Sequence, residues 1–144
     1  MSSYIYVDSS FISPVYAEDV HSAEAERRMS QKPMIWLTRI NRAEVAHAIF
    51  LQVFRKRISS EHAQFFWNNF EMDCRDGIWT KTDLPERIWD KSIHLARMYG
   101  PTLGVRTLDS LHVACALELH AQKFWTFDER QARLAEAVGL DTSA

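Results

Sequence analysis

Short apolar runs recur along the chain, separated by longer segments with helical spacing. Such runs, bounded by polar residues, are typical of buried strands in an α/β protein. They cover residues 3–8, 34–37, 78–80 and 123–127, and residues 140–142 could add a last edge strand.

Between these runs, apolar residues at spacings of three and four predict amphipathic helices. Val45, Ile49 and Val53 fall on one face of a helix predicted over residues 40–57. Asp83 and Glu86 have capping-box spacing, which predicts a helix from there to about Tyr99. Further helices are predicted at residues 11–17 (capped by Ser9 or Ser10), 20–30, 59–77 (capped by Ser59 or Ser60 and ended by Gly77), 107–121 and 128–138, with a loop at 100–106.

The resulting alternation, with one or two helices after each strand, predicts a three-layer α/β/α fold. Its central sheet would be mostly parallel, with four to five strands and helices on both faces. The 144 residues contain no repeat or linker, which predicts a single domain. In open sheets of this kind, ligands bind beyond the carboxyl ends of the strands.

The composition supports a folded α/β protein. Hydrophobic residues make up 47% of the chain, which is enough for a core and argues against disorder. Four Gly and four Pro are too few for an all-β design with many tight turns.

A net charge of −2 argues against general coating of a polyanion. A nucleic-acid substrate would need local basic patches, for which Arg39, Arg42 and the run 55–57 are candidates. Solvated helix surface is the simpler interpretation of these cations.

Cys74 and Cys115 are far apart and lack CxxC spacing, so a zinc site is not expected. The pattern suggests a reduced, cytoplasmic protein. The N-terminus does not resemble a signal peptide, and no apolar run is long enough for a membrane span.

Four acidic residues stand where predicted elements begin or end. Asp8 ends the first apolar run, Glu44 lies early in the 40–57 helix, Asp109 opens the 107–121 helix, and Asp128 follows the 123–127 run. Each has a simple alternative role as a helix cap or as an anion near a helix N-terminus.

Taken together, the four acids predict a metal site. Asp8 and Asp128 follow strands that should end at one edge of the sheet, where no protein cation is expected to neutralise them. Carboxylates gathered in this way repel one another, and Mg²⁺ or Mn²⁺ prefers such oxygen ligands. Ions held there can activate water for phosphodiester hydrolysis, with Ser9 and Thr126 able to orient ligands.

With these motifs, the sequence resembles the PIN-domain ribonucleases, and especially the VapC-type toxins of bacterial toxin–antitoxin pairs. The matching stretches occur in the family's order and span residues 4 to about 141, so the whole chain, 1–144, is expected to be one PIN-like domain. They are residues 4–10, 41–45, 106–114 and 125–130.

The resemblance implies an endoribonuclease that depends on Mg²⁺ or Mn²⁺. The family's catalytic and metal-binding acids map onto Asp8, Glu44, Asp109 and Asp128, and its hydroxyl residue before the last acid maps onto Thr126. It further implies an RNA substrate, a small antitoxin that blocks the site, and a homodimer.

Two other functions are compatible with parts of the pattern. An aspartyl-nucleophile phosphatase also begins with a strand ending in Asp, but it needs a second Asp where this chain has Ser10. A catalytically silent PIN-like module that binds RNA or protein would explain the fold, but it would gain little from four repelling acids.

Several other residues have two interpretations. His112 could face the acidic site, although a packed or surface histidine is more usual. Trp67, Trp79 and Trp89 could stack on RNA bases, but their spacing favours packing. Phe11, Val15 and Tyr16, with the 45–54 helix, could form either an exposed groove for a partner helix or an ordinary helix–helix contact.

Overall fold

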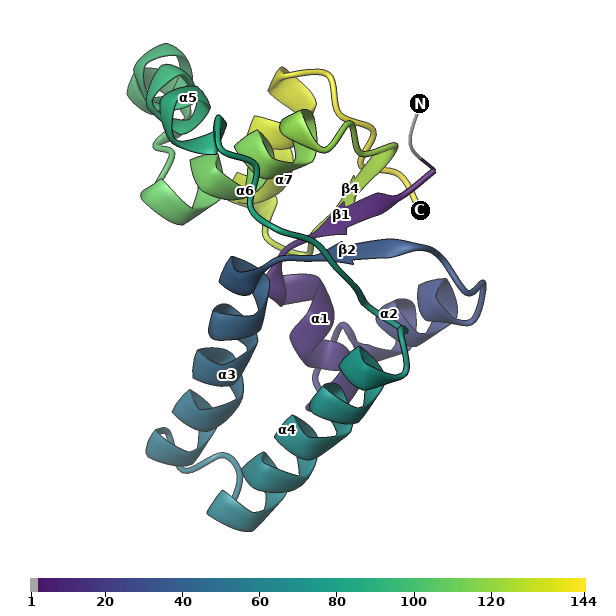
Figure 1. Ribbon diagram of the computed structural model, residues 1–144. Coiled ribbons are helices and arrows are strands. Elements are labelled where there is room, and N and C mark those ends of the chain that lie inside the picture. The colour runs from purple at the N-terminus through teal and green to yellow at the C-terminus, as the bar shows by residue number, and fades with distance from the viewer. Residues whose placement is uncertain (1–2) are drawn as a thin grey trace.

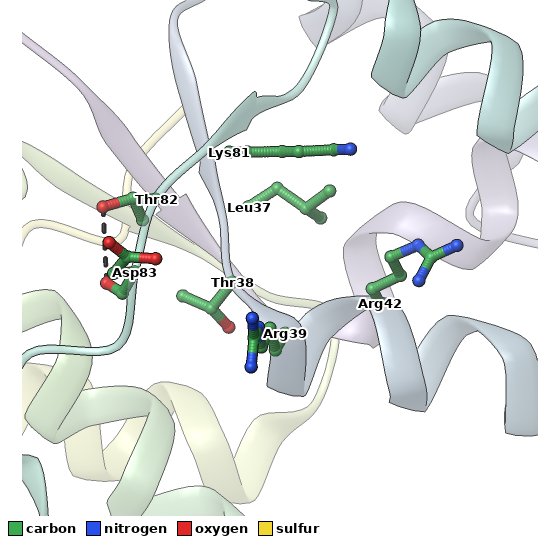
Figure 2. Close-up of a pocket in the computed structure, with 7 residues that line it drawn as sticks. All are labelled: Leu37, Thr38, Arg39, Arg42, Lys81, Thr82 and Asp83. Atoms are coloured by element: carbon green, nitrogen blue, oxygen red, sulfur yellow. Dashed lines mark hydrogen bonds between the residues drawn. The ribbon is translucent and has the colours of Figure 1, made fainter.

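The computed structural model describes residues 3–144 and contains a four-stranded, wholly parallel sheet in the order β3-β2-β1-β4. The predicted parallel sheet is therefore confirmed. Figure 2 shows β2 and β3 ending beside each other where the next helix begins, with Leu37 in register with Lys81. The strands are β1 (Ile5–Val7), β2 (Ile35–Leu37), β3 (Thr80–Lys81) and β4 (Lys123–Trp125).

Helices fill the segments between the strands, in the predicted order of one or two after each strand. They are α1 (Ser9–Tyr16), α2 (Ser22–Met29), α3 (Arg39–Phe54), α4 (Ser60–Arg75), α5 (Ile88–Leu103), α6 (Thr107–Glu118) and α7 (Glu129–Ala137). In Figure 1, α5, α6 and α7 lie on one side of the sheet and α1 to α4 on the other, as a three-layer fold requires.

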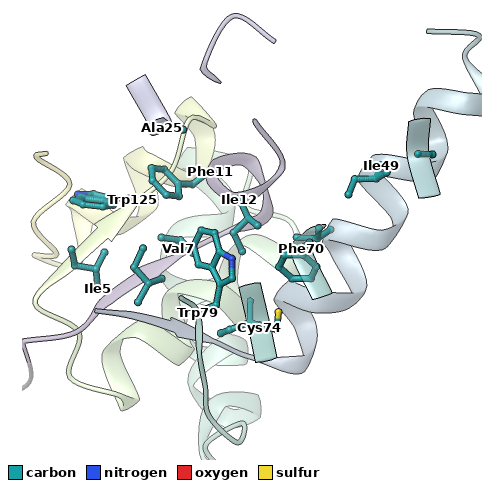
Figure 3. Close-up of a cluster of buried hydrophobic side chains, with 14 residues drawn as sticks. Ile5, Val7, Phe11, Ile12, Ala25, Ile49, Phe70, Cys74, Trp79 and Trp125 are labelled. Carbon is teal, nitrogen blue, oxygen red and sulfur yellow. The ribbon is translucent and has the colours of Figure 1, made fainter. Parts of the chain in front are cut away.

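Each face of the sheet has its own hydrophobic core, because alternate residues of a strand point to opposite faces. Ile5 and Val7 pack with α1 and α4 residues such as Phe11 and Phe70 (Figure 3). Tyr6, between them in sequence, packs on the other face with residues of α6 and α7. This alternation fixes β1 at the centre and sets the direction of the side chains at its end.

The starts of α3 and α4 are stabilised by side-chain caps. The Thr38 hydroxyl accepts a hydrogen bond from the Asn41 amide, and the Asn41 side chain bonds back to the Thr38 amide, forming a capping box. Ser59 caps α4 through the His62 amide, as predicted. The paired helices α3 and α4 then extend away from the sheet (Figure 1).

The prediction for α5 was wrong at both ends. The helix begins at Ile88, because Pro85 lies in the preceding turn and the Ile88 amide bonds to its carbonyl. It also continues through Gly100 and Pro101 to Leu103, so most of the loop expected there is helical. Pro101, in the last turn, donates no backbone hydrogen bond, and Gly104, with a φ of 64°, ends the helix in a left-handed conformation.

The structure also differs from the sequence prediction in the third strand, the last edge strand and the N-cap of α1. The third strand is displaced from 78–80 to Thr80–Lys81, which are the residues that pair with Trp36 and Leu37 of β2. The last edge strand is reduced to one bridge between Lys123 and Asp141. Asp8, rather than Ser9 or Ser10, occupies the N-cap position of α1, although its side chain makes no capping hydrogen bond.

The groove proposed between the first helix and the 45–54 helix is an ordinary packing contact. Phe11 is fully buried, and Val15 and Tyr16 pack against the same core. The two cysteines are both buried and free. Within residues 3–144, no helix has the length and apolar character needed to cross a bilayer.

Candidate active site

A cavity of about 490 Å³ opens at the carboxyl ends of β1 and β4, and all four predicted acids line it. It is called the acidic cavity below. Its lining comes from four separate segments of the chain, which the parallel sheet brings to one edge. The lining residues are Asp8, Ser9, Ser10, Glu44, Arg106, Thr107, Leu108, Asp109, His112, Asp128 and Gln131.

Asp8 is held by two hydroxyl groups at the end of the central strand. Ser10 donates a hydrogen bond to Oδ1 at 2.6 Å, and Thr126 donates one to Oδ2 at 2.7 Å. The carboxylate is only 6% exposed. Its orientation is therefore fixed by neutral donors.

Ser10 and Thr126 also connect the two strand ends to each other. Their hydroxyl oxygens are 3.0 Å apart, and they accept hydrogen bonds from the amides of Phe127 and Asp128, respectively. The supporting role predicted for Ser9 stays a prediction. Ser9 lines the cavity, but Ser10, which is on the same turn, makes the contact with Asp8.

Burial raises the pKa of the Asp8 carboxyl above its ordinary value. The neighbouring His112 and the hydrogen bonds from Ser10 and Thr126 oppose this rise, and the charge of Glu44 adds a smaller increase. At Asp8, desolvation therefore raises the pKa more than the mutual repulsion of the acids that the sequence suggested.

Glu44 is bound by a buried histidine rather than serving as a helix cap. His112 Nε2 contacts Glu44 Oε1, and the other ring nitrogen, Nδ1, is 2.6 Å from the Tyr6 hydroxyl. Because a carboxylate only accepts hydrogen bonds, His112 Nε2–H donates to Glu44. Sequence spacing raised His112 only as a possible neighbour of the site, and gave no signal for Tyr6.

Asp109 and Asp128 do have the helix-terminal roles that were the simple alternative. Asp109 accepts a hydrogen bond from the Arg106 amide at the start of α6. Asp128 caps α7, accepting from the amides of Arg130 and Gln131 through Oδ1. Neither role excludes ligand binding, because each carboxylate has a second oxygen and lines the acidic cavity.

The expectation that no protein cation would neutralise the acids was wrong. The Arg106 guanidinium lies 3.5 Å from Asp109 Oδ2 and 3.8 Å from Asp128 Oδ2. Both contacts are long, and the Arg106 side chain is 65% exposed. This arginine therefore compensates one half of the cavity loosely, while Asp8 and Glu44 have no Arg or Lys partner within residues 3–144.

The donor set fits a hard divalent cation. As the side chains stand, no three His, Cys, Asp or Glu residues within 3–144 are close enough to form a preassembled metal group. Mg²⁺ needs less than that, because it keeps several waters and binds through one or two carboxylates. Four carboxylates around one cavity, with one displaceable arginine, meet this requirement.

Packing and position decide the roles of the tryptophans and of the histidines other than His112. Trp79 belongs to the core and Trp67 packs against it, so neither offers a free face for a base. Trp89 is exposed, on α5. His47 and His120 are outside the acidic cavity.

The comparisons with known proteins agree with this geometry. Residues 5–137 match the PIN domain family. No curated protein matches the chain significantly.

Several solved structures share the fold. VapC20 of Mycobacterium tuberculosis, a toxin that cleaves the sarcin–ricin loop, is 16% identical with a TM-score of 0.70, covering 96% of this chain and 98% of its own. FitAcB from Neisseria gonorrhoeae is 14% identical with a TM-score of 0.67, covering 97% and 96%. PAE2754 from Pyrobaculum aerophilum is 12% identical with a TM-score of 0.64, covering 94% and 85%.

At these identities the solved structures establish the shared fold, whereas the family match spans nearly all of the chain. The resemblance noted in the sequence is thereby confirmed at the level of the family. This chain belongs to the PIN domain family.

Proposed function

We propose that this PIN-domain protein is an endoribonuclease that uses Mg²⁺ or Mn²⁺, and that it acts as the toxin of a toxin–antitoxin pair. The observation that carries the proposal is the convergence of Asp8, Glu44, Asp109 and Asp128 on one cavity at the sheet edge. The similarity in fold to VapC20, a toxin that cleaves RNA at the sarcin–ricin loop, supports the choice of substrate class.

In this proposal the four carboxylates would hold the metal ion. A bound Mg²⁺ or Mn²⁺ would supply an activated water and neutralise charge on the phosphate. Ser10 and Thr126 keep both oxygens of Asp8 fixed, and His112 keeps Glu44 directed into the cavity. Arg106 would leave Asp109 and Asp128 when the ion binds, and its guanidinium is then free to contact the phosphate.

The partners belong to the same proposal. An antitoxin needs an apolar surface, and α3 presents one in a hollow of about 430 Å³ lined by Ala46, His47, Phe50, Leu51 and Phe54. Phe54 is 83% exposed there, which is unusual for a phenylalanine without a partner. We further propose that the protein forms a homodimer in the cytoplasm.

The proposal is tested by incubating the purified protein with total RNA in Mg²⁺, Mn²⁺ or EDTA. We expect fragments with either ion and intact RNA in EDTA. Asp8→Asn should be inactive and Asp109→Asn should cleave more slowly than the parent, while Glu129→Gln, at an exposed acid beside the site, should cleave like the parent. Full activity of Asp8→Asn would show that the site is assigned wrongly.

A silent binding module is the second candidate, and one observation favours it. Arg106 already lies between two of the acids, as in a site that never binds metal. Calorimetric titration of the folded protein with Mn²⁺ separates the two candidates. Binding of the ion supports the nuclease, whereas the absence of binding together with intact RNA supports the module.

A further inference from the structure

A second cavity, of about 550 Å³, lies at the carboxyl ends of β2 and β3. Three of its lining residues are cations and one is an acid, although the chain as a whole carries a net charge of −2. It is called the basic cleft below and is shown in Figure 2. The lining residues are Leu37, Thr38, Arg39, Arg42, Lys81, Thr82 and Asp83.

Two of the three cations are available for a ligand. Arg42 already pairs with Glu71 at 2.7 Å and lies over the Trp67 ring, so its charge is partly used. Arg39 and Lys81 are exposed and form no salt bridge with any residue in 3–144. They come from different elements, α3 and β3, which meet where β2 ends (Figure 2).

The basic cleft and the acidic cavity are neighbours on one edge of the sheet. β2 pairs with β1, so the end of β2, which borders the basic cleft, lies beside the end that carries Asp8. The helix α3 also links them, since Arg39 lines the cleft and Glu44 lines the acidic cavity. Five residues of helix separate the two, a rise of about 7.5 Å.

A cavity lined by four carboxylates repels a phosphodiester, so it contributes little to holding RNA. The net charge of the chain also gives no general attraction. Backbone affinity must therefore come from cations close to the acidic cavity, and the basic cleft supplies them. The N-terminus of α3 adds the positive end of a 16-residue helix at the same place.

We propose that the basic cleft is a binding site for the RNA backbone, with Arg39 and Lys81 contacting phosphates that flank the one at the acidic cavity. The inference rests on the proposed function in that RNA is the substrate. Arginine matches phosphate with a bidentate fork, and lysine acts as a flexible point charge. The cleft thus positions the strand, while the acidic cavity performs the chemistry.

The test is equilibrium binding of a fluorescent single-stranded RNA in EDTA, where no cleavage occurs, at several salt concentrations. The double variant Arg39→Ala/Lys81→Ala should bind on the order of tenfold more weakly at about 0.1 M salt. The slope of log affinity against log salt should fall by about 1.4, since each phosphate contact on a single strand contributes roughly 0.7. Both residues are exposed, so the fold should be preserved, and a thermal melt checks this.

The matched control is Arg55→Ala/Arg57→Ala, which removes the same charge from exposed positions after α3. Parent-like binding by this control, together with the loss at the cleft, supports the inference. Equal loss in both variants would overturn it, because affinity would then depend only on total charge. Unchanged RNA binding by the cleft variant, with loss of binding to a polyglutamate peptide, would also overturn it and assign the cleft to an acidic protein segment.

Failure of this inference is distinguishable from failure of the proposed function. A parent protein that cleaves RNA with Mn²⁺, but whose affinity does not depend on Arg39 and Lys81, refutes only the basic cleft. A parent that never cleaves RNA refutes the nuclease, and the binding measurement in EDTA still decides the role of the cleft.

Discussion

The two halves of the acidic cavity are built differently. In one half, Asp8 accepts hydrogen bonds from two hydroxyls, and Glu44 contacts the His112 ring. In the other half, Asp109 and Asp128 accept hydrogen bonds from the backbone at helix starts and share the Arg106 guanidinium. The carboxylates of the first half are fixed in place but have no Arg or Lys partner within residues 3–144. Those of the second half have a cationic partner, Arg106, in loose contact.

This difference suggests a division of labour. Hydroxyl donors orient a carboxylate without supplying a full positive charge, so a cation gains most by binding at Asp8. Helix starts and Arg106 place positive charge beside Asp109 and Asp128. We therefore expect the Asp8 half to determine metal affinity and the Asp109 half to adjust it.

The largest expected effect separates the halves by activity. Asp8→Asn should reduce RNA cleavage by at least about 100-fold, beyond the loss typical of residues that only orient a ligand. Asp128→Asn should cost about tenfold, because asparagine also serves well as an N-cap and preserves α7. Single-turnover cleavage of one RNA by each variant measures the ratio of the two losses in rate. Equal losses would contradict the division of labour between the two halves of the cavity.

The second prediction tests whether His112, which contacts Glu44, positions that carboxylate. His112→Gln should weaken Mn²⁺ binding by roughly 10–100-fold, since partners that orient metal ligands typically have effects of this size. Tyr6→Phe, which removes the hydroxyl 2.6 Å from Nδ1, should have a smaller effect and cost about 1 kcal/mol of stability. Calorimetric titration with Mn²⁺ measures both affinities, and denaturant unfolding measures the stability of Tyr6→Phe.

The matched control for His112 is His94→Ala, at an exposed position on α5. It should leave Mn²⁺ affinity unchanged. If His112→Gln lowers the melting temperature but binds Mn²⁺ like the parent, then His112 is a packing residue and does not position Glu44.

The third effect is a pH dependence of stability in the metal-free protein. Burial raises the pKa of Asp8 in the folded state, so folding favours its protonated form. The contribution to stability is complete below the ordinary aspartate pKa and is lost as the pH rises through the folded-state value. Thermal melts in EDTA should therefore show the parent losing stability with rising pH relative to Asp8→Asn, and added Mn²⁺ should reverse the loss. Parallel pH profiles would show that Asp8 is not destabilised by burial.

The sequence predicted well the strands and helices that carry this site, because they depend on local signals. Apolar runs and helical spacing are properties of neighbouring residues, and they placed the strands and helices in their order along the chain. Once the sheet was parallel, strand ends had to meet at one edge, which brought Asp8 close to Asp128. The α5 boundaries failed because a proline within the last turn of a helix looks, in sequence, like a loop.

The supporting contacts were not predictable in the same way. Thr126 bonds to Asp8 across 118 residues of sequence, and Tyr6 contacts His112 across 106. Neither pair has a spacing that could indicate it. The choice of Ser10 over Ser9 depends on which side chain of the first turn of α1 faces β4, and the location of Arg106 depends on how the start of α6 meets α7.

The smallest expected effect concerns Arg106, and its sign distinguishes two roles. If Arg106 only competes with the metal, Arg106→Ala should strengthen Mn²⁺ binding, but by less than about fivefold, because exposed ion pairs contribute up to about 1 kcal/mol. Its contacts of 3.5 and 3.8 Å are consistent with this range. Arg130→Ala, at an exposed cation on α7, is the control for a general change in charge. Weaker Mn²⁺ binding by Arg106→Ala would instead mean that the arginine holds Asp109 and Asp128 in place for the ion, and the loosely held half of the cavity would then depend on it for order.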